Sequence, residues 1–188
     1  MFKKVISAVI VAILFVPSGV FALGGGTTNA DFLKIGMGAR PSAMGEAYAA
    51  AGDDSDAAFW NPAGISQVEN YHFTLMHLVW YAGANYDYFS GVMALDSTSS
   101  LGISLNAFWI PPYDSTQSDA YGNLAEGLTP MYYDLAIRAS YARILGDIYT
   151  NDFTIGNIAF GASLSYVQRQ ILDYASPALF TVDMGLLA

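Results

Sequence analysis

The sequence predicts an all-β protein, a transmembrane antiparallel β-barrel preceded by a short helical plug. Hydrophobic residues make up 54% of the chain and charged residues only 12%, which is too apolar for an ordinary water-soluble domain. From residue 71 onward, apolar residues recur at every second position, which is the period of a β-strand. These segments are about ten residues long, enough for a tilted strand to cross a bilayer, whereas soluble strands average about five or six.

Residues 1–22 have the features of a secretory signal peptide. Lys3 and Lys4 form a positive n-region, residues 5–16 form an apolar h-region, and a small-residue cleavage site ends at Ala22. We therefore expect export to the cell envelope. The chain contains no cysteine, which excludes disulfides, cysteine-ligated metals and a lipoprotein anchor. Its net charge of −9 disfavours nucleic acid as a partner.

A plug is predicted at residues 34–64, after a flexible leader at residues 23–33 and before the strands of residues 65–188. This segment is rich in alanine and glycine, so it can pack closely. We expect Ser42 to cap a helix of about two turns that ends near Gly52.

Three acidic residues, Asp53, Asp54 and Asp56, follow this predicted helix. Clustered carboxylates could hold calcium. The spacing lacks the glycine and the distal glutamate of an EF-hand loop, so we favour capping of the next helical turn, residues 57–60. Pro62 then restricts Asn61 to an extended conformation, which ends the plug.

About six strands are expected after the plug. Aromatic residues at their ends, such as Trp80 and Trp109, are typical of the girdles at membrane interfaces. The long connection at residues 110–130 is expected outside the cell and the shorter ones in the periplasm. A soluble β-sandwich would show the same alternation with its apolar face inward. The predicted strands lie near residues 71–81, 86–95, 101–109, 131–144, 153–168 and 179–188.

Residues 32–64, FLKIGMGARPSAMGEAYAAAGDDSDAAFWNPAG, resemble the N-terminal signature of the PorV/PorQ-type branch of FadL-like outer-membrane proteins. That signature reads as a KIG-x-GAR start, a MGGAY-like helix, an acidic pair and a WNPAG close. The resemblance implies a larger closed barrel whose N-terminal segment packs inside the lumen. The matching residues are Gly36, Gly38, Arg40, Gly45, Asp53, Asp54, Trp60, Asn61, Pro62 and Gly64.

The resemblance implies one of two functions. PorV-type members take part in protein secretion and receive cargo at the cell surface, whereas FadL passes hydrophobic solutes such as long-chain fatty acids. Six strands cannot close, because bacterial outer-membrane barrels have at least about eight. We therefore expect an N-terminal part of a longer protein, or else several chains that complete one barrel.

Candidate contact residues come from two places in the predicted barrel. Asp134 and Arg138 are four residues apart on the lumen side of one strand, where they could pair with the plug acids. The connection at residues 110–130 offers a surface for a partner protein. Its stiff or aromatic candidates are Pro111, Pro112, Tyr113 and Tyr121.

An enzymatic function is not expected. His72 and His77 are five apart in one strand and face opposite sides, so they cannot share a metal. There is no G-x-S-x-G sequence, and Gly36-Met37-Gly38 lacks the third glycine of a dinucleotide loop. We expect no cofactor and no metal. The expected partners are the lipid and lipopolysaccharide of the outer membrane, with a secreted cargo protein or a hydrophobic solute.

Overall fold

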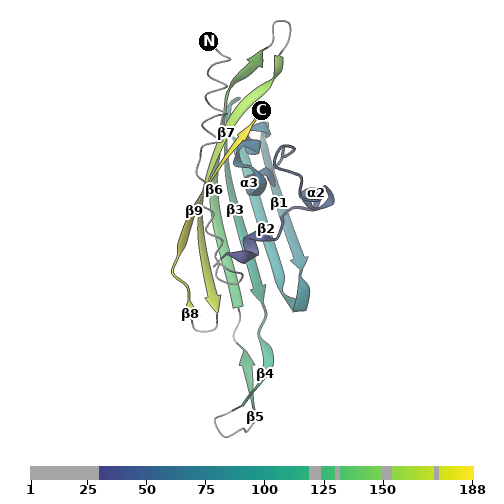
Figure 1. Cartoon of the computed structure of the whole chain (residues 1–188), viewed down its shortest axis with the longest axis vertical. Helices are drawn as coiled ribbons and strands as arrows, with labels where there is room; N and C mark the ends of the chain where they lie inside the picture. Colours follow the sequence, from purple (N-terminus) through teal and green to yellow (C-terminus); the bar gives the residue numbers. More distant parts are fainter. Residues whose placement is uncertain (1–29, 119–123, 130–131, 150–153, 172–173) are drawn as a thin grey trace, which may run out of the picture.

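The structure is a computed structural model that describes residues 30–118, 124–129, 132–149, 154–171 and 174–188. The predicted signal peptide and Tyr121 lie outside these residues. Antiparallel strands dominate the fold, and short helices lie against one face of the main sheet (Figure 1). The all-β prediction is confirmed.

The main sheet has the order β1-β2-β3-β6-β7, and both β8 and β9 pair with β7. All pairings are antiparallel. A separate hairpin, β4 with β5, extends beyond the end of the main sheet (Figure 1). The strands are β1 Tyr71–Val79, β2 Asn85–Ala94, β3 Ser99–Ile110, β4 Tyr113–Ser118, β5 Leu124–Thr129, β6 Tyr132–Tyr149, β7 Thr154–Ile171, β8 Tyr174–Ala175 and β9 Leu179–Leu187.

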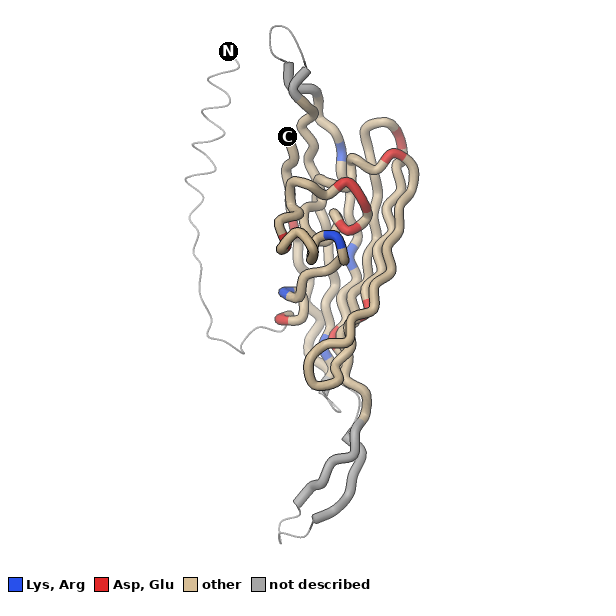
Figure 2. The backbone as a smooth tube through the Cα atoms, turned by 90° about the vertical axis from the view of Figure 1, so that its right-hand side faces the viewer, with Lys and Arg blue, Asp and Glu red and all other residues tan. Residues whose placement is uncertain are grey.

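The helices are short and lie almost entirely before the first strand. Among the described residues, none is long and apolar enough to span a membrane. Figure 2 shows that many charged residues lie in this helical region and at the ends of the strands. The helices are η1 Asp31–Lys34, α2 Ala39–Ala43, α3 Ala57–Trp60, η2 Pro62–Gln67 and η3 Tyr81–Gly83, the last joining β1 to β2.

The main sheet has an outer face, which is exposed, and an inner face, which the helices cover. On the outer face Leu75 is 75% exposed and Ile103 54% exposed, while Ser104 on the inner face is completely buried. Alternation along the strands therefore separates exposed apolar side chains from buried polar ones. The outer face includes Phe73, Leu75, Leu101, Ile103, Leu105, Leu164, Phe180, Val182 and Met184.

The core lies between the helices and the inner face. Phe32 and Met37 pack with Tyr86 and Tyr88. A second cluster joins residues of α3 and η2 to β2 and β6, with Ile65 fully buried. Phe32 falls within the predicted leader, so part of that segment is packed on the sheet.

Two strands are longer than predicted. The connection predicted at residues 145–152 is mostly strand, because β6 continues to Tyr149 and β7 begins at Thr154. The pairing shifts register between Ile144 and Gly146. A β-bulge accommodates a glycine without ending the strand, which is why Gly146-Asp147 is not a turn here.

The long connection predicted at residues 110–130 contains two strands of its own, because β4 and β5 form a ladder inside it. Pro111 and Pro112 end β3, since proline lacks a backbone donor. The ladder resumes at Tyr113, because cross-strand backbone hydrogen bonds do not require an apolar alternation.

Candidate functional site

The candidate site is the junction between the plug, defined as residues 31–67, and the wall, which is the main sheet. Asn61 connects the two. Its Nδ2 donates to Ala49 O at 2.8 Å within the plug and to Leu186 O of β9 at 3.1 Å. Its Oδ1 accepts from Ala63 N at 3.0 Å, which caps η2. One amide side chain thus caps a helix and holds the plug against the wall.

Two wall glycines allow this close approach. A Cβ added to Gly161 of β7 would overlap the backbone of Pro62 and Ala63, and one added to Gly185 of β9 would overlap Asn61 Oδ1. A larger residue at Gly161 would displace the plug backbone, and one at Gly185 would displace the Asn61 side chain. These two glycines therefore form the steric seat of the plug, meaning the place where the absence of a side chain lets the Asn-Pro-Ala segment pack against the sheet.

Arg138 of β6 also binds the plug, but through backbone atoms. Its Nη1 donates to the carbonyls of Ala58 at 3.0 Å and Phe59 at 3.3 Å, at the end of α3. Its guanidinium lies over the Phe59 ring and forms an ion pair with Asp183 of β9 at 3.5 Å. A cation at a helix C-terminus satisfies carbonyls that have no partner within the helix.

The predicted pairing of Asp134 and Arg138 with the plug acids is wrong. Asp134 lies on the inner face and is 1% exposed, but it binds Arg169 of β7 through two bonds of 2.8 and 3.0 Å. Tyr132 donates to the same carboxylate at 2.6 Å. The charge of Asp134 is therefore balanced within the wall.

The plug acids find their partner within the plug. Arg40 forms ion pairs with Asp53 and, at 3.5 Å, with Asp54. Its guanidinium lies 5.3 Å from the ring centre of Tyr48, whose hydroxyl donates to Asp54 at 2.7 Å. Burial raises the pKa of Tyr48, and the hydrogen bond to Asp54 raises it further.

The helix predicted to start after Ser42 is absent. Instead, α2 covers Ala39–Ala43 and includes Ser42. Pro41 is tolerated because the first four backbone N–H groups of a helix have no partner within it. Gly45 and Glu46 then take left-handed conformations, with φ of 63° and 67°, which end the helix. Ser42 does not cap α2 but donates to Gly38 O at 2.8 Å.

Glycines set the spacing inside the plug. Gly38 has a φ of 93°, and a Cβ there would overlap Asp56. A Cβ on Gly36 would lie 3.1 Å from the Trp60 ring, and one on Gly64 would lie 2.7 Å from Gly52 O. Trp60 donates through Nε1 to Met37 O at 2.9 Å, which ties the two ends of the plug together.

The capping predicted for the acids is only partly observed. Asp56 occupies the N-cap position of α3 without a side-chain cap, and Asp54 Oδ1 accepts from Asp56 N at 2.9 Å. The Asp56 side chain is buried and its Oδ1 has no partner. Burial raises the pKa of Asp56, and the nearby Asp54 carboxylate raises it further. Within the described ranges, no group of three or more His, Cys, Asp or Glu residues could hold a metal ion.

Ser55 attaches the plug to β1 and β2. Its Oγ lies 2.9 Å from Nδ1 of His72 and 2.8 Å from Oγ1 of Thr74. The hydroxyl of Ser90 in β2 donates to the carbonyl oxygen of Ser55 at 2.7 Å. His72 thus meets the plug on the inner face, whereas His77 lies on the outer face.

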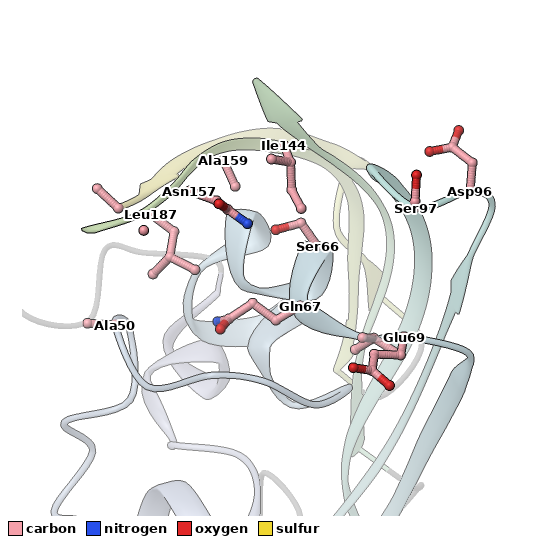
Figure 3. A pocket seen from close by; sticks show the side chains of 13 residues that line it. Ala50, Ser66, Gln67, Glu69, Asp96, Ser97, Ile144, Asn157, Ala159 and Leu187 are labelled. Atoms are coloured by element: carbon pink, nitrogen blue, oxygen red, sulfur yellow. The ribbon is translucent and has the colours of Figure 1, made fainter. Parts of the chain in front are cut away.

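A cavity of about 650 Å³ lies at one end of the junction, beside η2 (Figure 3). Ser66 and Gln67 of η2 point into it, and Gln67 also donates to Gly52 O at 2.8 Å. The carboxylates of Glu69 and Asp96 lie along its rim, opposite the aliphatic side chain of Leu187.

The predicted partner surface lies elsewhere in the structure. Pro111 and Pro112 are exposed between β3 and β4, and Tyr113 is the first residue of β4. These positions are at the end of the sheet, away from the plug (Figure 1).

Sequence reasoning did not select several residues of the junction. The set is Ser55, Gly161, Asp183 and Gly185. The available signal was the small or polar residue at every second position of β7 and β9, which marks the face that a plug can approach.

Comparison of the chain with protein-family models, with curated proteins and with solved structures gave no match.

Proposed function

We propose that the main sheet is part of the wall of an outer-membrane β-barrel of the FadL-like group, with the plug in its lumen. The observation that carries this proposal is the contrast between the two faces. Apolar side chains such as Leu75 and Phe180 are exposed, while Asp134 and Arg138 are buried on the other side. Exposed apolar side chains are favourable in lipid, and interior polar groups need protein partners or water.

Within this group, we propose a PorV-type role as a component or cargo-receiving partner of a protein secretion system. The hairpin of β4 and β5 supports the role, because it extends past the wall at the end that also carries the turn between β1 and β2 (Figure 1). Under the proposed orientation, this end is outside the cell. Projecting loops on a rigid scaffold are common binding elements.

The alternative is a channel for hydrophobic solutes, in which the plug moves to open a path. Two observations favour the secretion role over the channel. Hydrogen bonds from Asn61, Arg138 and Ser55 hold the plug to the wall or to its own helices. In addition, the carboxylates of Glu69 and Asp96 line the cavity beside η2, and none of its described lining residues is Lys, Arg or His. These carboxylates would therefore repel a fatty-acid anion.

A deletion of the hairpin separates the two functions. Residues 113–129 would be replaced by a short glycine-serine linker in the native gene, and secreted proteins bound at the surface would be identified by co-purification. We expect the deletion to abolish cargo capture while the barrel still inserts. Retained capture would contradict the cargo-receiving role.

The matched variant is Asn61→Ala, which loosens the plug and leaves the hairpin unchanged. We expect it to leave cargo capture intact. If it instead increases the uptake of long-chain fatty acids, and the hairpin deletion has no effect, the channel function replaces the secretion role.

A further inference from the structure

Three polar side chains form a connected group on the outer face, where almost everything else is apolar. His77 of β1 bonds through Nδ1 to Oδ1 of Asp87 of β2 at 2.7 Å. Trp109 of β3 donates through Nε1 to Oδ2 of Asp87 at 2.7 Å. The group therefore spans three adjacent strands at the end of the wall that carries the hairpin.

The bonding leaves Nε2 of His77 as the one ring nitrogen of the group for a ligand, beside an Asp87 side chain that is 43% exposed. Both carboxylate oxygens of Asp87 accept hydrogen bonds, and the indole N–H of Trp109 is used. The His77 side chain is 55% exposed and its Nδ1 is occupied, so Nε2 is the outward polar atom. Because Nδ1 bonds to the Asp87 carboxylate, a hydrogen bond from Nε2 to an anion requires a proton on both ring nitrogens.

An apolar groove begins at this group. It has a volume of about 500 Å³ and is lined by His77 and Asp87 together with Leu75, Phe89 and Leu105. A polar head at His77 and an acyl chain along the three apolar side chains would both find complementary surfaces.

A second groove on the same face is also apolar but has no charged side chain among the described residues of its lining, unlike the groove at His77. It has a volume of about 330 Å³ and lies among Phe73, Met93, Leu101 and Ile103. Its histidine, His72, bonds to Ser55 on the inner face. No charged side chain lines this second groove, so it can hold an acyl chain but has nothing to hold a head group.

We propose that the groove at His77 binds a phosphorylated glycolipid of the outer leaflet, the lipid A part of lipopolysaccharide, with a phosphate oxygen at His77 Nε2. This inference rests on the proposed membrane orientation, which places the hairpin end outside the cell. Among the described residues of β2 and β3, Asp87 is the charged group that faces His77. The chain has a net charge of −9, so a preference for an anionic lipid would come from this site and not from overall charge.

Displacement of a quenching lipid tests the proposal. The full chain would carry Trp60→Phe and Trp80→Phe, so that Trp109 alone emits, and would be reconstituted in vesicles of brominated phosphatidylcholine. Lipid A, phosphatidylglycerol or unbrominated phosphatidylcholine would then be added in equal acyl-chain amounts. We expect lipid A to restore Trp109 fluorescence with an apparent affinity about fivefold higher than that of phosphatidylcholine, since one cation near a membrane surface contributes about 1 kcal/mol.

Substitutions identify the group responsible. His77→Ala should remove the preference for lipid A, and His77→Lys should restore it. Met93→Ala, in the second groove, should leave it unchanged. Recovery that is equal for lipid A and phosphatidylcholine, or a preference that survives His77→Ala, would overturn the proposal. Recovery that is equal for phosphatidylglycerol and lipid A would overturn the assignment to lipid A.

The same experiment separates this inference from the proposed function. If brominated phosphatidylcholine does not quench Trp109 at all, the outer face is not in lipid, and both the membrane wall and the lipid site are wrong. If quenching occurs without a preference for lipid A, only the lipid site is wrong.

Discussion

The two faces of strand β3 carry side chains in the reverse of the arrangement that is usual in a soluble β-protein. On the outer face, Leu101 and Ile103 are exposed, whereas on the inner face Ser104 and Asn106 are buried beneath the plug. A soluble sheet buries its apolar face and exposes its polar one. Here the polar face requires protein cover, because buried polar groups need hydrogen-bond partners. Asn106 donates to the Tyr86 hydroxyl of the neighbouring strand, and Ser90 donates to the Ser55 carbonyl of the plug. Under the proposed function, the apolar face is in contact with lipid.

The largest expected effect comes from filling the steric seat of the plug. Gly161→Ala places a methyl group against the backbone of Pro62 and should destabilise plug docking by about 3 kcal/mol. The measurement is the urea midpoint of plug unfolding in detergent, monitored by the fluorescence of Trp60. The chain carries Trp80→Phe and Trp109→Phe, so that Trp60 is its only tryptophan. The control is Gly156→Ala in the same strand, where a Cβ meets nothing within 4 Å. Equal midpoints for the two variants would refute the close contact.

The next effect comes from the cation that binds the plug backbone. Arg138→Met leaves the carbonyls of Ala58 and Phe59 without their donor, and we expect a loss of about 2 kcal/mol in plug stability. The same Trp60 assay would measure it. Arg143→Gln, on the exposed side of the same strand, should change stability by less than about 0.5 kcal/mol. A similar loss in both variants would mean that net charge, and not the bonds to α3, holds the plug.

Asn61→Ala should have a smaller effect, a loss of about 1 kcal/mol, because it removes a helix cap and the bond to Leu186 without introducing a clash. Hydrogen exchange of the backbone N–H of Ala63 would report the same change locally. Unchanged protection at Ala63 would show that the Asn61 side chain does not cap η2.

The smallest effect concerns pH. Burial raises the pKa of Asp56 above its ordinary value of 3.8, so the folded plug holds this proton to a higher pH than the unfolded chain does. Plug stability should therefore fall as the pH rises from 3.8 through the raised pKa. Asp56→Asn should flatten that part of the stability profile. A variant that keeps the original slope would place the responsible group elsewhere.

The strands were largely predictable from the sequence, because period-two alternation follows directly from strand geometry. Leu101 and Ser104 fall on opposite faces in the sequence pattern and in the structure. The hairpin of β4 and β5 was not predictable in this way, since its residues lack an apolar alternation.

The plug was less predictable, because its contacts depend on backbone atoms that the sequence does not distinguish. Arg138 was expected to meet acids and instead binds the carbonyls at the end of α3. The early α2 reflects Pro41 in a first turn that needs no N–H from it. Gly161 and Gly185 could be recognised only once Asn61 and Pro62 lay opposite them.

The most direct test of the central claim is the lipid exposure of alternate residues along β3. The chain has no cysteine, so residues 101–106 can be replaced by cysteine one at a time, spin-labelled and studied in lipid vesicles. We predict high oxygen accessibility at positions 101, 103 and 105, and low accessibility to both oxygen and a water-soluble nickel reagent at 102, 104 and 106. If positions 101, 103 and 105 are instead open to the nickel reagent, the outer face lies in water and the membrane-wall account is wrong.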